Sequence, residues 1–119
     1  MSNLSELLPS GGGQNVVEFV ASGSLDAGVP VAINSNGTVS LVTSGNIGSL
    51  IGITAKAIAD TATGDVNTWG GINEAQTSLT IGSDYYAQTD GTITTVSTSP
   101  AQKVGTAISA TTINMKDLT

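Results

Sequence analysis

Short apolar segments alternate with polar turn residues along this chain, and their spacing favours strands over helices. In residues 15–21, Val17 and Phe19 fall on one face while Glu18 lies on the other between valines, which is the period of two of a β-strand. Pro30 marks the start of another strand or an edge strand, because proline cannot donate a hydrogen bond to a sheet. Further strands are predicted over residues 66–70, 103–108 and 111–116.

Residues 50–59 contain alanines that would suit a helix, but Gly52 and the β-branched residues beside it favour a strand. The alternation places Ile51 and Ile53 on one face and Gly52 and Thr54 on the other. Helix is expected to be marginal in the chain, with one short turn over residues 2–8 that ends at Pro9.

A β-hairpin is predicted within residues 77–96. Its turn is Asp90-Gly91, the dipeptide favoured by a two-residue type I′ turn, in which both central residues need positive φ. Residues 92–96 are mostly β-branched and suit the returning strand.

The same pattern occurs earlier in the chain. Residues 28–42 align without a gap on residues 82–96, an offset of about 54 positions, and place Asn36-Gly37 on Asp90-Gly91. Aliphatic-glycine segments follow in both places, at residues 51–55 and 104–108. An ancient duplication explains this similarity, and so does the use of one turn chemistry in two hairpins. The second interpretation is favoured here.

Together these elements predict an all-β fold, a small β-sandwich or barrel of short strands with an extended N-terminal arm. The β domain is expected to span residues 15–119 as a single unit. Residues 1–14 read as the arm, hinged at the glycines of residues 11–13.

The arm carries the predicted partner-binding residues, which are Leu4, Leu7, Leu8 and Pro9. A disordered terminus is the usual fate of such a segment. The leucines favour the alternative, an arm that docks on a neighbouring subunit, because apolar side chains gain nothing by staying exposed to water in a solvated tail.

Composition excludes several classes of function. The net charge is −6 and the lysines are scattered, which argues against binding to nucleic acid and to anionic membranes. Neither a secretory signal nor an apolar run long enough for a membrane helix is recognisable. Only 10% of residues are charged, a composition common in proteins that pack against other subunits.

No catalytic constellation is recognisable. The chain has no His and no Cys, so the usual nucleophile–base pairs and soft-metal sites are excluded. The carboxylates are expected at turns, where Asp caps its own backbone; they are Asp26, Asp60, Asp65, Asp84 and Asp90. Residues 60–65 lack the ligand spacing of a calcium loop. We therefore expect no enzyme, metal or cofactor.

The few aromatic residues allow two interpretations. Trp69, Tyr85 and Tyr86 could form a small binding platform. At least two of them are instead expected in the core, because a chain with 3% aromatic residues needs its large side chains for packing.

Turn residues and small residues recur in three stretches, which are Leu79-Thr-Ile-Gly-Ser-Asp-Tyr-Tyr-Ala-Gln-Thr-Asp-Gly-Thr-Ile93, Val104-Gly-Thr-Ala-Ile-Ser-Ala-Thr111 and Gly64-Asp-Val66. These stretches resemble small β-rich modules in virion proteins of tailed bacteriophages. The opening Ser5-Glu-Leu-Leu-Pro-Ser-Gly-Gly-Gly-Gln-Asn15 is similar to the start of structural proteins of such phages. The resemblance covers most of the chain, and turn and small residues carry it.

The resemblance implies a non-enzymatic structural protein. An arm joined to a compact β domain is similar in plan to capsid decoration or cement proteins, which bind the major capsid protein on the capsid exterior, often as trimers. The alternative is a fibre or tail-tip module that binds a host receptor or glycan. Exposed strand edges and low charge also predict a homo-oligomer, for which a homotrimer is expected.

Overall fold

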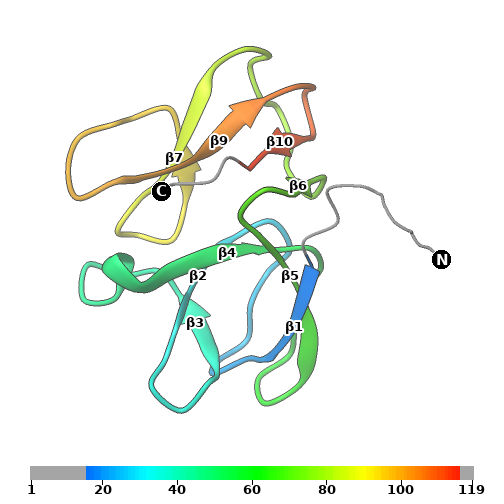
Figure 1. Cartoon of the computed structure of the whole chain (residues 1–119), viewed down its shortest axis with the longest axis vertical. Helices are drawn as coiled ribbons and strands as arrows, with labels where there is room; N and C mark the ends of the chain where they lie inside the picture. The colour runs from blue at the N-terminus through cyan, green and yellow to red at the C-terminus, as the bar shows by residue number, and fades with distance from the viewer. Residues whose placement is uncertain (1–15, 116–119) are drawn as a thin grey trace, which may run out of the picture.

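The computed structural model describes residues 16–115 and consists of two antiparallel five-stranded sheets (Figure 1). The predicted all-β class is confirmed. The helical element in the described residues is one 3-10 turn, η1 (Ile47–Ser49). The first sheet contains β1 (Val16–Val20), β2 (Pro30–Ile33), β3 (Val39–Leu41), β4 (Leu50–Thr54) and β5 (Thr63–Thr68). The second contains β6 (Ile72–Asn73), β7 (Asp84–Ala87), β8 (Ile93–Thr94), β9 (Gln102–Ala107) and β10 (Ile113–Asn114).

The two sheets have the same topology. The first has the order β1-β5-β4-β2-β3 and the second β6-β10-β9-β7-β8, so each strand of the first has a counterpart five strands later. We call residues 16–70 the first repeat and residues 71–115 the second repeat. Figure 1 shows them as two units, one above the other.

The correspondence extends to an irregularity in the pairing. The register between β2 and β4 shifts between Val31 and Ala32, and the register between β7 and β9 shifts between Tyr85 and Tyr86. Each shift is a β-bulge, which bends the strand and leaves one residue unpaired. The similarity therefore extends well beyond two turns, and the interpretation that turn chemistry alone accounts for it is insufficient.

Both hairpin turns differ from the predicted type. The Gly37 N–H donates to the Asn34 carbonyl at 3.0 Å, and the Asn34 N–H donates to the Thr38 carbonyl at 2.8 Å, so the loop has three residues. The second hairpin has the same two bonds: the Gly91 N–H donates to the Gln88 carbonyl at 3.1 Å, and the Gln88 N–H donates to the Thr92 carbonyl at 2.8 Å. Only the glycines have positive φ, as in a type I turn followed by a G1 bulge. The predicted two-residue type I′ turn is wrong.

Several strand boundaries also differ from those predicted. β4 ends at Thr54 instead of residue 59, and β5 begins at Thr63, before the predicted residue 66. Within residues 77–83 the chain makes a turn, and the hairpin begins only with β7. The short β6 lies in a stretch predicted as a loop. Pro30 begins β2, and β2 lies inside the sheet between β4 and β3, so the strand-start interpretation is the correct one.

The first sheet closes on itself. Ala21, directly after β1, forms a parallel bridge with Val39 of β3, and the Ser22 N–H donates to the Val39 carbonyl at 2.8 Å. The two outer strands of the sheet are thereby joined. A cluster of buried side chains fills the interior, and its members are Ala21, Leu25, Val31, Val39, Ile58 and Val66.

Strand β4 links the two repeats. Ile53 is fully buried and packs in the cluster of the second repeat, with Val104, Ile113 and other residues. Ile51 packs instead against the first cluster. The prediction that these two isoleucines share a face is wrong, because Ile51 is the extra residue of the bulge and breaks the alternation.

A buried asparagine also joins the repeats. The Asn73 amide donates to the Thr54 carbonyl at 2.9 Å and to the Asn67 Oδ1 at 2.8 Å. Its own Oδ1 accepts from the Ala75 N–H and from the Gln76 amide, at 3.2 and 3.0 Å. Asn73 therefore satisfies its hydrogen-bonding groups without water.

Candidate functional site: a groove beside strand β8

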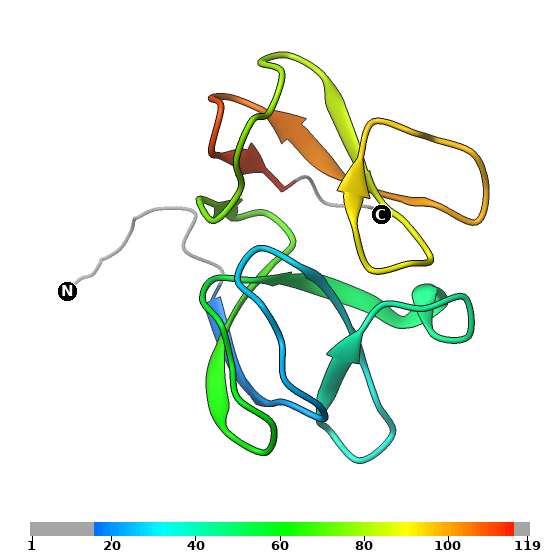
Figure 2. The same cartoon turned by 180° about the vertical axis from the view of Figure 1, so that it is seen from behind.

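An open groove of about 530 Å³ is lined mostly by the second repeat, together with Ala27 and Gly28 of the first. Residues 75–80 form one wall, and β8 with Thr95 forms the other. In Figure 2 these walls are the yellow-green segment before β7 and the yellow strand β8. We call this depression the β8 groove. All of its lining residues are uncharged: Ala27, Gly28, Ala75, Gln76, Thr77, Ser78, Leu79, Thr80, Tyr85, Ile93, Thr94 and Thr95.

The β8 groove lies where the first repeat is closed. Ile93 is the counterpart of Val39, 54 positions later in the chain. In the first repeat the Val39 carbonyl accepts a hydrogen bond from the Ser22 N–H. In the second repeat the chain that follows β6 takes another course. The Gln76 N–H donates to the Thr111 carbonyl at 3.2 Å, which holds this segment against the β9–β10 connection instead of β8.

Two further hydrogen bonds hold the far wall. The Leu79 N–H donates to the Ala110 carbonyl at 3.0 Å, and the Thr80 N–H donates to the Tyr85 hydroxyl at 2.8 Å. Tyr85 is a buried residue of β7, so its hydroxyl ties the wall to the sheet. The groove is consequently built into the fold on both sides.

Strand β8 presents a free backbone edge to the groove. The Gln88 N–H donates to the Thr92 carbonyl at 2.8 Å, so the backbone carbonyl of Thr92 points toward β7. Backbone groups alternate in direction along a strand, so the N–H and carbonyl of the next residue, Ile93, point away from β7. β8 is the last strand of its sheet, and within residues 16–115 no further strand pairs with it.

The predicted partner-binding residues Leu4, Leu7, Leu8 and Pro9 lie outside the described residues. Their role therefore stays a prediction. Sequence reasoning missed the β8 groove, because nothing in residues 75–80 reveals that the chain leaves the course taken in the first repeat. The alignment of the two hairpins did indicate that β3 and β8 are counterparts, and this was the sequence feature from which the groove could have been found.

The aromatic residues do not form a binding platform together. Trp69 and Tyr85 pack in the cluster of the second repeat, which confirms the expectation that at least two of the three are in the core. Tyr86 follows Tyr85 in β7, so it points to the opposite face of the sheet.

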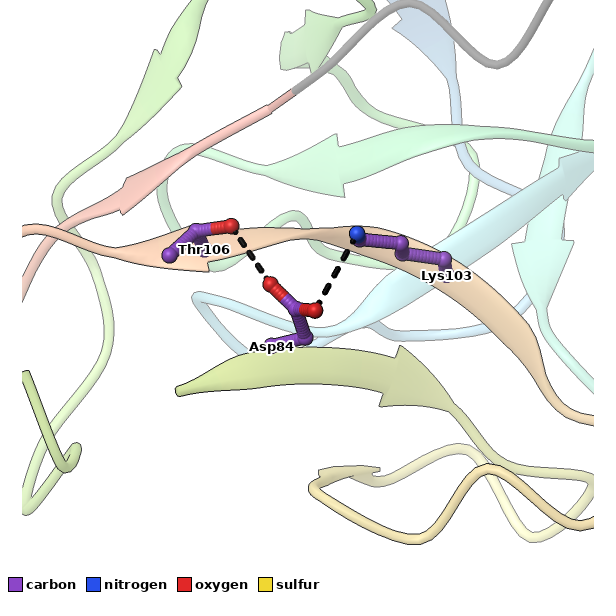
Figure 3. Close-up of polar contacts among 3 residues, drawn as sticks. All are labelled: Asp84, Lys103 and Thr106. Atoms are coloured by element: carbon purple, nitrogen blue, oxygen red, sulfur yellow. Dashed lines mark hydrogen bonds and ion pairs between the residues drawn. The ribbon is translucent and has the colours of Figure 1, made fainter. Parts of the chain in front are cut away.

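Two of the acidic residues predicted at turns lie in strands instead. Asp65 is in β5, opposite Glu18, and Asp84 is in β7. Figure 3 shows the Asp84 carboxylate between Lys103 Nζ, 3.2 Å from Oδ2, and the Thr106 hydroxyl, which donates to Oδ1 at 2.7 Å. The prediction failed because these cross-strand partners are distant in sequence. A partly exposed pair of this kind contributes about 0.2–1 kcal/mol.

Asp60 and Asp90 do occupy turns. Asp60 Oδ1 accepts the Gly23 N–H at 2.8 Å, and Asp90 Oδ1 accepts from both the N–H and the hydroxyl of Thr92, at 3.1 and 2.6 Å. These bonds from Thr92 hold the pKa of the Asp90 carboxyl below its usual value.

Residues 16–115 contain no group of three or more His, Cys, Asp or Glu side chains placed to hold a metal ion. In the same residues no helix has the length and apolar character needed to cross a membrane. Comparison with known proteins gives neither a matching family model nor a matching curated protein.

Proposed function

We propose that this chain is a non-enzymatic structural protein of a tailed-bacteriophage virion, a capsid decoration protein. It binds the major capsid protein on the outer surface of the head as a homotrimer. The leucine-bearing arm supplies one attachment, through Leu4, Leu7, Leu8 and Pro9. The observation that carries the proposal is the resemblance of the hairpin and arm segments to modules of such virion proteins.

The polar residues of the structure support a structural role. The Asn73 amide forms hydrogen bonds that join the two repeats. The Asp84 carboxylate forms an ion pair with Lys103 on the neighbouring strand. A side chain engaged in this way serves the fold, and none of these groups is aimed into the β8 groove. This arrangement favours assembly over chemistry.

Exposed apolar residues support an assembly partner. In β1, Val16, Val17 and Val20 are 39%, 45% and 39% exposed, and Ile81 is 69% exposed. β1 is also an outer strand of its sheet, so its edge is open over these residues. A subunit packed beside β1 would cover both the valines and the edge.

Labelling of purified virions with an antibody against the chain tests the proposal. Signal over the head is expected, and virions produced without the protein serve as the control. Signal confined to the tail would contradict decoration. It would favour the alternative, a fibre or tail-tip module that binds a receptor or glycan.

A further inference from the structure

The two repeats differ at one edge. In the first repeat, chain following β1 covers the edge of β3, whereas the corresponding edge of β8 borders an open groove. We propose that the β8 groove binds an extended segment by strand addition to β8, and that this segment is residues 1–15 of a second copy of the chain. The proposal concerns contacts between copies: it is an alternative to the capsid attachment of Leu7 and Leu8 proposed above, and the decoration role itself does not depend on it.

The first repeat indicates what the groove requires. There the added strand runs parallel to β3, and its N–H donates to the carbonyl of Val39. Ile93 presents the same groups in the second repeat, so main-chain hydrogen bonds would supply part of the affinity. The lining is uncharged and consists mostly of hydroxyl, amide and backbone groups, with Leu79 and Ile93 among them, so an uncharged segment that can form hydrogen bonds and place one or two apolar side chains beside them fits best.

Residues 1–15 have this character. Leu7 and Leu8 could enter the groove, and residues 7–15 carry no charged side chain. Fifteen extended residues reach about 50 Å, which exceeds the longest extent of the structure, 44 Å. The segment is thus long enough to leave its own molecule and fill a groove on the next.

The place where this segment joins the structure also fits. Val16 and Ala75 line one smaller depression of about 250 Å³, and Ala75 lines the β8 groove as well. The arm therefore begins close to a groove. Val16 and Val17 stand exposed at that point. A second copy that docks here would cover them, whereas an arm folded back into its own groove would leave the copies apart.

Sedimentation velocity of the isolated protein at micromolar concentration tests the exchange. We expect the full chain to sediment as an oligomer and a chain lacking residues 1–14 to sediment as a monomer. Thr95→Pro should also give a monomer, because Thr95 lines the groove two residues after Ile93 and proline removes the outward N–H. Ser97→Pro is the matched control, since residue 97 is exposed and outside the groove, and it should keep the oligomer.

Variants in the arm guard against a folding defect in Thr95→Pro. Leu7→Ser together with Leu8→Ser leaves residues 16–115 unchanged and should give a monomer as well. Mixing this variant with Thr95→Pro leaves one competent groove and one competent arm, so a complex of one copy of each is expected. A monomeric full chain, an oligomer that survives deletion of the arm, or a mixture that stays monomeric would each overturn the proposal.

Discussion

Gly52 and Gly105 hold the same place in the two repeats. Gly52 pairs with Val31 and Gly105 with Tyr85, in both cases beside the bulge. A Cβ at Gly52 would overlap the carbonyl oxygen of Asn67, and one at Gly105 would overlap that of Asn114. A backbone carbonyl in a ladder cannot move aside as a side chain can, so glycine is required at both positions.

Gly52→Ala should destabilise the protein by about 1–3 kcal/mol or more, because the added methyl group forces β4 and β5 apart. Gly48→Ala is the control, since the space around Gly48 is open and its φ is ordinary. Urea unfolding of both variants measures the difference. Equal midpoints would contradict the steric explanation.

Asp90 should titrate below the usual value of 3.8, because its carboxylate accepts hydrogen bonds from Thr92. A folded pKa below the unfolded one means that these bonds stabilise the hairpin above the unfolded pKa, and that this stabilisation is lost as the pH falls through the folded pKa. NMR titration of the carboxyl measures the shift.

Asn36 provides the control for this titration. Its Oδ1 accepts from the N–H and hydroxyl of Thr38, at 3.1 and 2.7 Å, which is the same arrangement without a charge. Asp90→Asn should therefore keep the turn and remove the acid-dependent part of its stability. An Asp90 pKa at or above 3.8 would contradict the role of the two bonds.

Asn73→Asp should be strongly destabilising at neutral pH. The side chain is fully buried, and a carboxylate would face the Thr54 carbonyl and Asn67 Oδ1 without a proton to donate. An unpaired buried charge costs about 3–5 kcal/mol. Asn114→Asp, at an exposed strand position, should change the unfolding midpoint little. Stability of Asn73→Asp should recover partly in acid, as protonation of the new carboxyl restores a donor.

At the scale of elements, the sequence predicted which segments form strands better than it predicted how they pair. The alternation of apolar and polar residues located β1, and the β-branched residues that follow Gly91 located β8. Residues 72–73 are too few to show a period, so β6 was missed. The bulge at Ile51 was missed too, because it arises from the register with β2 and not from the residues of β4.

The repeat was only partly visible in the sequence for a related reason. The hairpins keep a constant spacing and similar turn residues, which the alignment of residues 28–42 on residues 82–96 detected. β1 (Val16–Val20) and β6 (Ile72–Asn73) are counterparts with no common pattern, because one is an exposed outer strand and the other is packed against the first repeat. The β8 groove follows from this difference, and local sequence does not encode it.

At the scale of the whole molecule, the repeats should unfold together. Ile53 of the first repeat is part of the second cluster, so neither core is complete alone. Trp69 packs against that cluster and reports on it by fluorescence, while circular dichroism reports on both sheets. We expect the two signals to give one coincident urea transition. Separate transitions would mean that the repeats are independent.

Ile53→Ala should lower stability by about 2–5 kcal/mol, since it removes a fully buried side chain from the contact between repeats. Ile81→Ala, at a position that is 69% exposed, is the control and should have little effect. A comparable loss in both variants would contradict a shared core.

Deleting residues 1–14 should leave the strands folded but weaken capsid binding severely. Ordering one arm costs on the order of 1 kcal/mol per residue, and burying each of its three leucines returns about 1.5–3 kcal/mol, so a single arm does not bind stably by itself. An oligomer with several arms makes each later docking step intramolecular. Unchanged sedimentation with capsids after the deletion would place the attachment surface on the strands instead.

The position of Ile53 also has a consequence for synthesis on the ribosome. All strands of the first sheet precede residue 70, so their pairing partners are synthesised before those of the second sheet, but the core of β4 stays incomplete until Ile53 is covered. The nascent protein then presents Ile53 to solvent, with Leu50 beside the same cluster. A chain that ends near residue 70 would therefore keep this apolar surface exposed and would be prone to aggregate.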